Sequence, residues 1–139
     1  MKPNFLCPKC QAHLVCSDHL ILALESEAGD KKGLVMMNIA LGDYSTQSHP
    51  SLEIKDGELV NFYCPACHGN LKVPDINDNL VMVKMIDKDG KSYDVYFSRV
   101  TGEQSTFKID QEDMIEPFGK DASEYVTYFT NKLKKQMNL

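Results

Sequence analysis

The chain has little arginine and an excess of acidic residues. Only one of its 15 basic residues, Arg99, is arginine, and its 139 residues carry a formal net charge of −5 at pH 7. Surfaces that hold phosphates or read bases favour arginine forks and a clustered basic face. The composition therefore disfavours nucleic-acid binding. That function stays open as an alternative because of lysines near the cysteines and near the C-terminus, at Lys9, Lys72, Lys132, Lys134 and Lys135.

Long apolar runs are also missing. No run approaches the 18 residues that a transmembrane helix needs, and only one lysine and no apolar segment precede the first cysteine. We therefore expect a soluble, cytoplasmic protein without membrane contact. In a reducing compartment, five cysteines indicate metal or redox chemistry rather than a disulfide framework.

The length fits one domain, or one core with a small appendage. The turn-rich stretch NLKVPDINDN (70–79) is the best boundary within it. We divide the chain into residues 1–74, a hairpin region that carries the paired cysteines, and residues 75–139, a hairpin or meander followed by a helix. The two parts are expected to pack as one unit.

Alternating apolar residues and turn signals predict antiparallel hairpins before the last 20 residues. The expected strand pairs are 19–26 with 34–41, 51–54 with 59–64 through a turn at Asp56-Gly57, and 80–86 with 91–98, with a further strand at 105–109. Within 91–98 the alternation predicts a half-buried strand.

The C-terminal segment changes to helical spacing, with Val126, Phe129, Leu133 and Met137 on one face. Asp121 followed by Glu124 resembles a capping box and predicts a helix over about 121–137. The expected fold class is mostly β (β-rich α+β), with antiparallel hairpins and a C-terminal amphipathic helix.

Two short cysteine pairs share the pattern C-P-x-C: Cys7 with Cys10, and Cys64 with Cys67. Two intervening residues allow one tight turn to present both sulfurs to one ion, and proline presets the turn. No internal repeat is expected beyond these two pairs. Paired short-spaced cysteines are a strong signal for a zinc site.

In this pattern the chain resembles the zinc-ribbon proteins, whose two knuckles lie at the bases of adjacent β-hairpins. The resemblance covers about residues 5–72 and implies one structural Zn²⁺ held by Cys7, Cys10, Cys64 and Cys67. Two features depart from it: Gln11 and His68 stand where family knuckles usually have glycine, and 53 residues separate Cys10 from Cys64. Hairpins would fill that long insert at little cost in loop-closure entropy.

Cys64, Cys67 and His68 also match the C-x-x-C-H string of c-type haem attachment, and C-x-x-C alone matches thiol oxidoreductases. The missing export segment disfavours haem. Redox catalysis is disfavoured because Gly69-Asn70 and Pro74 argue against a helix after Cys67.

Other residues near these motifs could join a site. Cys16, His13 and His19 lie close to the first pair, and we interpret Cys16 as a small core residue. His68 and Arg99 are the candidate partner or ligand contacts. Arg99 could hold a carboxylate or phosphate through its guanidinium fork, or pair locally with Glu103.

The sequence favours a small non-catalytic zinc-binding protein that acts as a protein-interaction or regulatory module. Four thiolates close the zinc coordination shell, which disfavours an enzyme. The identity of the protein partner stays open. The alternatives are a nucleic-acid-associated or transcription-machinery zinc ribbon, and a thiol redox or zinc-release sensor.

Overall fold

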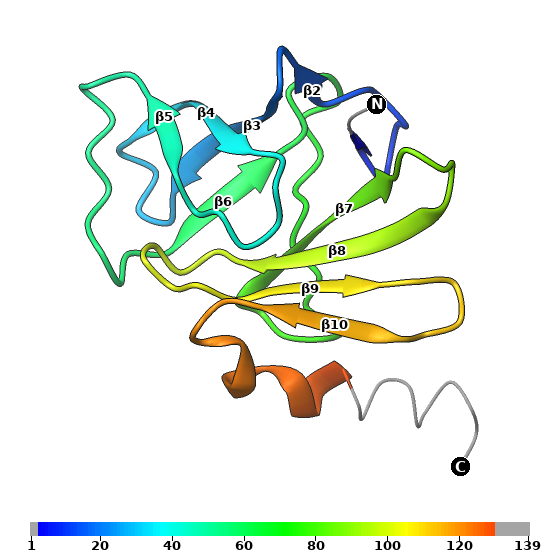
Figure 1. Cartoon of the computed structure of the whole chain (residues 1–139). Coiled ribbons are helices and arrows are strands. Elements are labelled where there is room, and N and C mark those ends of the chain that lie inside the picture. Colours follow the sequence, from blue (N-terminus) through cyan, green and yellow to red (C-terminus); the bar gives the residue numbers. More distant parts are fainter. Residues whose placement is uncertain (1–2, 130–139) are drawn as a thin grey trace.

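The computed structural model describes residues 3–129 as two antiparallel β-sheets that share one core (Figure 1). Sheet A has the strand order β1 (Asn4–Leu6), β7 (Leu80–Ile86), β8 (Ser92–Ser98), β9 (Thr106–Ile109) and β10 (Ile115–Phe118). Sheet B has the order β2 (Val15–Cys16), β3 (His19–Ser26), β4 (Lys32–Asn38) and β5 (Thr46–Ser48), and β6 (Val60–Tyr63) also pairs with β3.

The main core lies between the inner faces of the two sheets. Along β3, Leu20, Leu22 and Leu24 are buried and alternate with more exposed residues, as expected for a strand with one face on a core. Sheet A contributes Phe5, Val81, Val83, Met85, Val95 and Phe97 to the same cluster. The buried side chains that alternate along the strands of both sheets therefore pack together in one hydrophobic layer.

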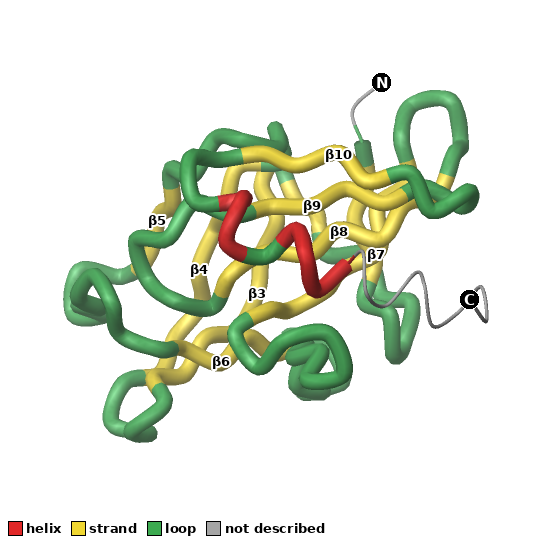
Figure 2. Tube along the Cα trace, turned by 90° about the horizontal axis from the view of Figure 1, so that it is seen from below, coloured by secondary structure: helices red, strands yellow, loops and turns green. Residues whose placement is uncertain are grey.

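A second, smaller core covers the opposite face of sheet A. Phe129 packs against Tyr96 of β8 and Phe107 of β9, with ring centroids 4.9 and 4.5 Å apart. In Figure 2 the helical segment lies across this face. The expectation that 91–98 is half-buried is therefore wrong at Tyr96, which is 4% exposed because helical residues cover the second face.

Several expected strands are confirmed. The hairpins β3–β4 and β7–β8 and strand β9 form as the alternation predicts. Residues 51–54 form no strand, which corrects the prediction of a hairpin with 59–64; β6 pairs with β3 instead. Leu52 and Ile54 are apolar because they pack on the main core from a loop. The expected turn is present, with Gly57 at φ 86°.

Four short strands were not anticipated: β1, β2, β5 and β10. All three residues of β5 are exposed, and β10 begins within the acidic stretch 110–116, so neither shows apolar alternation. Backbone pairing holds β5 on β4 and β10 on β9. Hydrophobic periodicity could not reveal them.

The C-terminal helical part is small within the described residues. It consists of the 3₁₀ turn η1 (Ala122–Glu124) and a helical turn over 126–129. Tyr125 and Phe129 are buried, while Val126 is exposed. The rest of the predicted helix, including Leu133 and Met137, lies outside the described residues.

The capping box at the start of this segment is wrong. Asp121 makes no side-chain capping bond. Its carboxylate accepts a hydrogen bond from the Gln104 N–H at 2.9 Å, and its own N–H donates to the Gln104 carbonyl. Asp121 therefore ties the C-terminal segment to the connection before β9.

The regions before and after residue 74 contact each other through backbone pairing. β1 pairs with β7, and the main core takes side chains from both regions. Within residues 3–129, no helix is long and apolar enough to cross a membrane.

Asp121→Ala should lower the free energy of unfolding by about 1 kcal/mol, because it removes the acceptor of the Gln104 N–H. Glu124→Ala is the matched control, because Glu124 is exposed and would matter only in a capping box. Chemical denaturation of both variants measures the difference. An equal loss of stability in the two variants would support the capping box and contradict the role assigned to the Gln104–Asp121 hydrogen bond.

Candidate metal centre

Each cysteine pair lies in a tight turn between two short antiparallel arms. In the first turn the Cys7 N–H donates to the Ala12 carbonyl at 3.0 Å, and the Gln11 N–H donates to the Cys7 carbonyl at 2.9 Å. Outside the turn, Leu6 and His13 form an antiparallel bridge. The backbone therefore holds Cys7 at the base of the turn and Cys10 near its tip.

The second turn repeats the first with an offset of 57 residues. The Cys64 N–H donates to the Gly69 carbonyl, the His68 N–H donates to the Cys64 carbonyl, and Tyr63 and Asn70 form the equivalent bridge. The structure thus contains two matching knuckles, defined as residues 5–14 and 62–71.

The sequence carries a signal for this repeat that extends past the cysteines. FLCPKCQAHL and FYCPACHGNL share the pattern F-x-C-P-x-C-x-x-x-L. The shared residues Phe5, Phe62, Leu14 and Leu71 are all buried in the main core. The expectation that no repeat extends beyond the cysteine pairs is therefore wrong: each knuckle is anchored by a phenylalanine before it and a leucine after it.

The two positions that depart from the glycine pattern both have a left-handed backbone conformation. Gln11 has φ 66° and His68 has φ 62°. These are the positions at which zinc-ribbon knuckles usually have glycine, since glycine adopts positive φ without a steric penalty. The backbone conformation is kept here with non-glycine residues, at a modest cost.

The four sulfur atoms of Cys7, Cys10, Cys64 and Cys67 all lie within 4.8 Å of one another. Two pairs across the knuckles are at 3.8 Å (Cys7–Cys67) and 3.7 Å (Cys10–Cys64). Sulfurs placed about 2.3 Å from a central ion at tetrahedral corners would be about 3.8 Å apart. The cluster could therefore bind one tetrahedral metal ion.

Backbone donors surround the sulfurs. Cys7 Sγ accepts from the N–H groups of Lys9 and Cys10 at 3.3 and 3.4 Å. Cys64 Sγ accepts from Ala66 and Cys67 at the same distances. Such bonds favour the charged thiolate, the form in which cysteine binds metals.

One thiol of the cluster resists losing its proton when no cation is present. The Ala12 N–H lowers the pKa of the Cys10 thiol, but burial and hydrogen bonds with the thiols of Cys64, Cys67 and Cys7 raise it to about 12. A bound cation reverses this balance because it stabilises the thiolates. Lys9 adds local positive charge: its stem lies so close to Gly69 that a Cβ there would be 2.5 Å from Lys9 Cδ.

The knuckles join the two sheets. In the first knuckle β1 pairs with β7, and the chain leaving the knuckle enters β2, which pairs with β3. In the second knuckle β6 pairs with β3, and Lys72 forms a bridge with Val81 of β7. Each knuckle therefore has one arm on sheet A and one on sheet B, and the sulfur cluster lies where the two knuckles meet.

The other candidate ligands lie outside the cluster. Cys16 is exposed on β2, so its interpretation as a core residue is wrong. His13 Nδ1 is 2.7 Å from Asn4 Nδ2, and His19 Nδ1 is 3.1 Å from the Ser17 carbonyl oxygen. His68 is exposed at the tip of the second knuckle.

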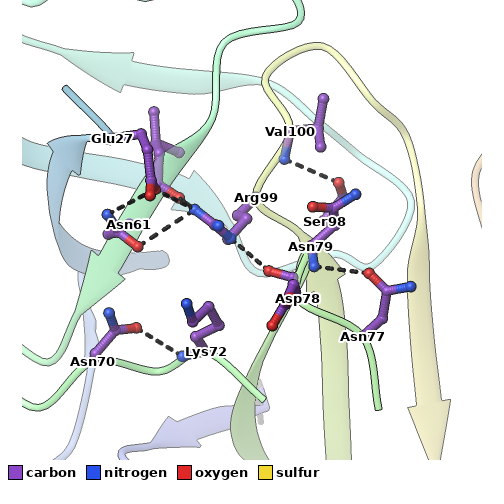
Figure 3. A network of polar contacts seen from close by, with 11 residues as sticks. Glu27, Asn61, Asn70, Lys72, Asn77, Asp78, Asn79, Ser98, Arg99 and Val100 are labelled. Atoms are coloured by element: carbon purple, nitrogen blue, oxygen red, sulfur yellow. Dashed lines mark hydrogen bonds and ion pairs between the residues drawn. The ribbon is translucent and has the colours of Figure 1, made fainter. Parts of the chain in front are cut away.

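Arg99 is buried and forms a polar network between the sheets (Figure 3). Its guanidinium donates to Glu27 Oε2 at 2.8 Å and to the carbonyls of Asp78 and Val60 at 2.6 and 3.3 Å. Local pairing with Glu103 is wrong, since that carboxylate accepts from Ser98 Oγ. Arg99 is 5% exposed. Its hydrogen bonds connect the end of β8 to β6 and to the β3–β4 turn.

Arg99 also changes the ionisation of its partner. The hydrogen bond and the positive charge of Arg99 lower the pKa of the Glu27 carboxyl below its usual value. A carboxylate with a lowered folded-state pKa stabilises the fold above its unfolded pKa, and this contribution is lost as the pH falls through the folded value.

Comparisons of the chain with protein-family models, with curated proteins and with solved structures found no match. The fold and the site therefore define its class by themselves: a two-sheet β protein with a four-cysteine cluster that could bind a metal. The four clustered cysteines are consistent with a zinc-ribbon-like pair of knuckles, and no family match identifies the chain as one.

Arg99→Ala should lower the free energy of unfolding by about 2–3 kcal/mol, because it removes the ion pair with Glu27, the buried hydrogen bond to the Val60 carbonyl and the partly buried one to the Asp78 carbonyl. Glu27→Gln should cost less, because Glu27 is half exposed. The Glu27→Gln loss should be present above the ordinary pKa of 4.5 and disappear as the pH falls through the lower folded-state value.

Denaturation at a series of pH values measures these losses. Glu116→Gln, an exposed position on β10, is the control and should give no pH-dependent difference from wild type. A Glu27→Gln loss that grows on acidification would contradict the assigned pair.

Proposed function

We propose that the chain is a non-catalytic protein with one structural zinc ion held by Cys7, Cys10, Cys64 and Cys67. The supporting observation is the approach of the four Sγ atoms, all within 4.8 Å of one another. Zinc and iron both accept four tetrahedral thiolates, and zinc is the ion of closed structural sites.

The position of the cluster supports a structural rather than a chemical role. A four-thiolate shell leaves no open coordination position for a substrate. The knuckles join sheet A to sheet B, so metal binding is coupled to packing of the main core. Structural zinc of this kind contributes on the order of 10 kcal/mol to folding.

We further propose that the protein acts as an interaction module through the outer face of sheet B. Register places Ile21 opposite Met36, and Ala23 between Leu34 and Tyr63. These five residues, here called the outer face, point away from the main core and belong to neither core cluster. Leu34 is 57% exposed. The other four are partly exposed, and contiguous apolar residues at a surface are typical of contact surfaces.

Charge indicates the kind of partner. The chain has a net charge of −5, so a protein that surrounds an apolar contact with basic residues would be complementary. The same charge opposes nucleic acid, for which the described lysines nearest the cluster are Lys9 and Lys72. The reducing cytoplasm is the proposed compartment because all five cysteines are free thiols.

A second candidate function is a thiol sensor that releases zinc on oxidation. The observation that favours it is the unequal burial of the four sulfurs: Cys7 and Cys64 are buried, whereas Cys10 and Cys67 are exposed. An oxidant could reach the exposed pair.

The protein purified without added metal should contain one zinc per chain and no stoichiometric iron by elemental analysis. Replacing Cys64 and Cys67 by serine should remove the zinc and the cooperative unfolding transition, because two of four ligands are lost. Cys16→Ser is the matched control at an exposed cysteine outside the cluster, and should keep both.

Wild-type protein without metal, carrying a Cys64–Cys67 disulfide that cycles readily, would overturn the structural role. Peroxide treatment of the zinc form separates the two candidate functions. Slow thiol loss supports structural zinc. Rapid oxidation of two thiols to a disulfide, with peroxide reduced to water and zinc released, supports the sensor.

The interaction role predicts that Leu34→Glu abolishes capture of specific proteins from cell extract by the immobilised protein, because it places a charge in an apolar contact. Met114→Glu is the control, since Met114 is 66% exposed elsewhere, just before β10. Partners retained by wild type and Met114→Glu and lost with Leu34→Glu should then bind as purified proteins. Capture unchanged by Leu34→Glu would rule out the outer face.

A further inference from the structure

A cavity of about 430 Å³ lies between the two sheets. Its walls include core side chains from both inner faces: Phe5, Leu24, Val35, Phe62, Val95 and Phe97. No cysteine lines it, so it is separate from the metal centre. Its size falls within the range of about 300–1,000 Å³ that is usual for small-molecule sites.

One wall of the cavity is the long connection between β4 and β6. Leu41, Leu52 and Ile54 of this connection line the cavity and pack against the main core. The connection is tied to sheet A through Tyr44, whose hydroxyl lies 2.8 Å from Thr106 Oγ1 and donates to the Phe118 carbonyl at 3.2 Å.

The wall is also tied at its other end. The Gly57 N–H donates to the Thr101 carbonyl at 2.8 Å. Asp56 lies so close to Gly102 that a Cβ there would be 2.7 Å from Asp56 Oδ1. A connection held at both ends therefore forms a fixed wall of the cavity, which stays open to solvent on one side.

The charged lining residues are mainly acidic. Asp43, Asp56 and Glu103 line the cavity; the two aspartates are exposed and mark its solvent side. The cationic side chain in the described lining is Arg99, which is already paired with Glu27 at 2.8 Å. Among residues 3–129, no ion pair joins Asp43 or Asp56 to a cation, so the solvent side carries net negative charge from the described residues.

We propose that the cavity binds a small neutral or cationic molecule with an apolar body, which lies between the sheets while its polar or positively charged group faces Asp43 and Asp56. Apolar walls take up the body by removing its surface from water. Carboxylates at the solvent side attract a cation and repel an anion. A hydrogen bond from Ser45 lowers the pKa of the Asp43 carboxyl, so it stays charged at neutral pH.

The charge preference is tested with three probes that share one body: dodecylammonium, dodecanol and dodecanoate, each used below its micelle concentration. Calorimetric titration of the metal-loaded protein should show binding of the ammonium and the alcohol. Dodecanoate should bind at least about tenfold more weakly than the ammonium, because it faces two like charges. Asp43→Asn with Asp56→Asn should remove most of this difference.

The location is tested with two tryptophan variants of neighbouring residues on β4. Met37 lines the cavity, whereas Met36 lies on the outer face opposite Ile21. Met37→Trp should fill the cavity and abolish binding of dodecylammonium. Met36→Trp should bind it as wild type does. The chain has no tryptophan, so indole fluorescence reports folding of each variant.

Three outcomes would overturn the proposal: no probe binds wild type, dodecanoate binds as tightly as dodecylammonium, or Met36→Trp and Met37→Trp bind equally. If Met37→Trp does not fold, Leu52→Trp fills the cavity from the connection, where a loop residue tolerates the larger ring. Unchanged binding in that folded variant would equally exclude the cavity. All tests use zinc-loaded protein, so their outcome is independent of which function the metal serves.

Discussion

The approach of four sulfur atoms is the constraint on which the arrangement of this protein depends. Each knuckle has one arm on β3 or its neighbour β2 and one arm at the edge of β7. Drawing the two knuckles together therefore brings the edges of sheets A and B together. Thiolates this close would repel one another, so a metal ion would supply the positive charge that allows all four to lose their protons and face one centre.

The long interval between the two knuckles follows from this arrangement. Residues between Cys10 and Cys64 build sheet B, and antiparallel pairing returns the chain to the second knuckle close to the first. Arg99 connects the sheets at another place, where its guanidinium donates to the Glu27 carboxylate and to backbone carbonyls. The cysteine cluster and the Arg99 network thus lie at two different places around one core, and the cavity lies within that core beside the β4–β6 connection.

Much of the fold was predictable wherever one face of a strand meets the core. The hairpins β3–β4 and β7–β8 were predictable from the alternation of apolar residues along each strand. The two cysteine pairs were predictable from the short spacing within each pair. The strands β5 and β10 were not predictable, since their exposed or acidic residues carry no apolar period. Residues 51–54 were wrongly predicted to form a strand for the opposite reason: their apolar side chains lie in a loop that packs on the core.

The sequence by itself determined which four cysteines could bind a metal, because two matching short turns place the same ligand atoms at the same backbone positions. It also carried the repeated phenylalanine and leucine anchors of those turns. Only the tertiary structure decided that Arg99 pairs with Glu27, that Cys16 is exposed and that a cavity lies between the sheets. These features join residues far apart in the chain, and their positions depend on how two sheets pack rather than on any local pattern.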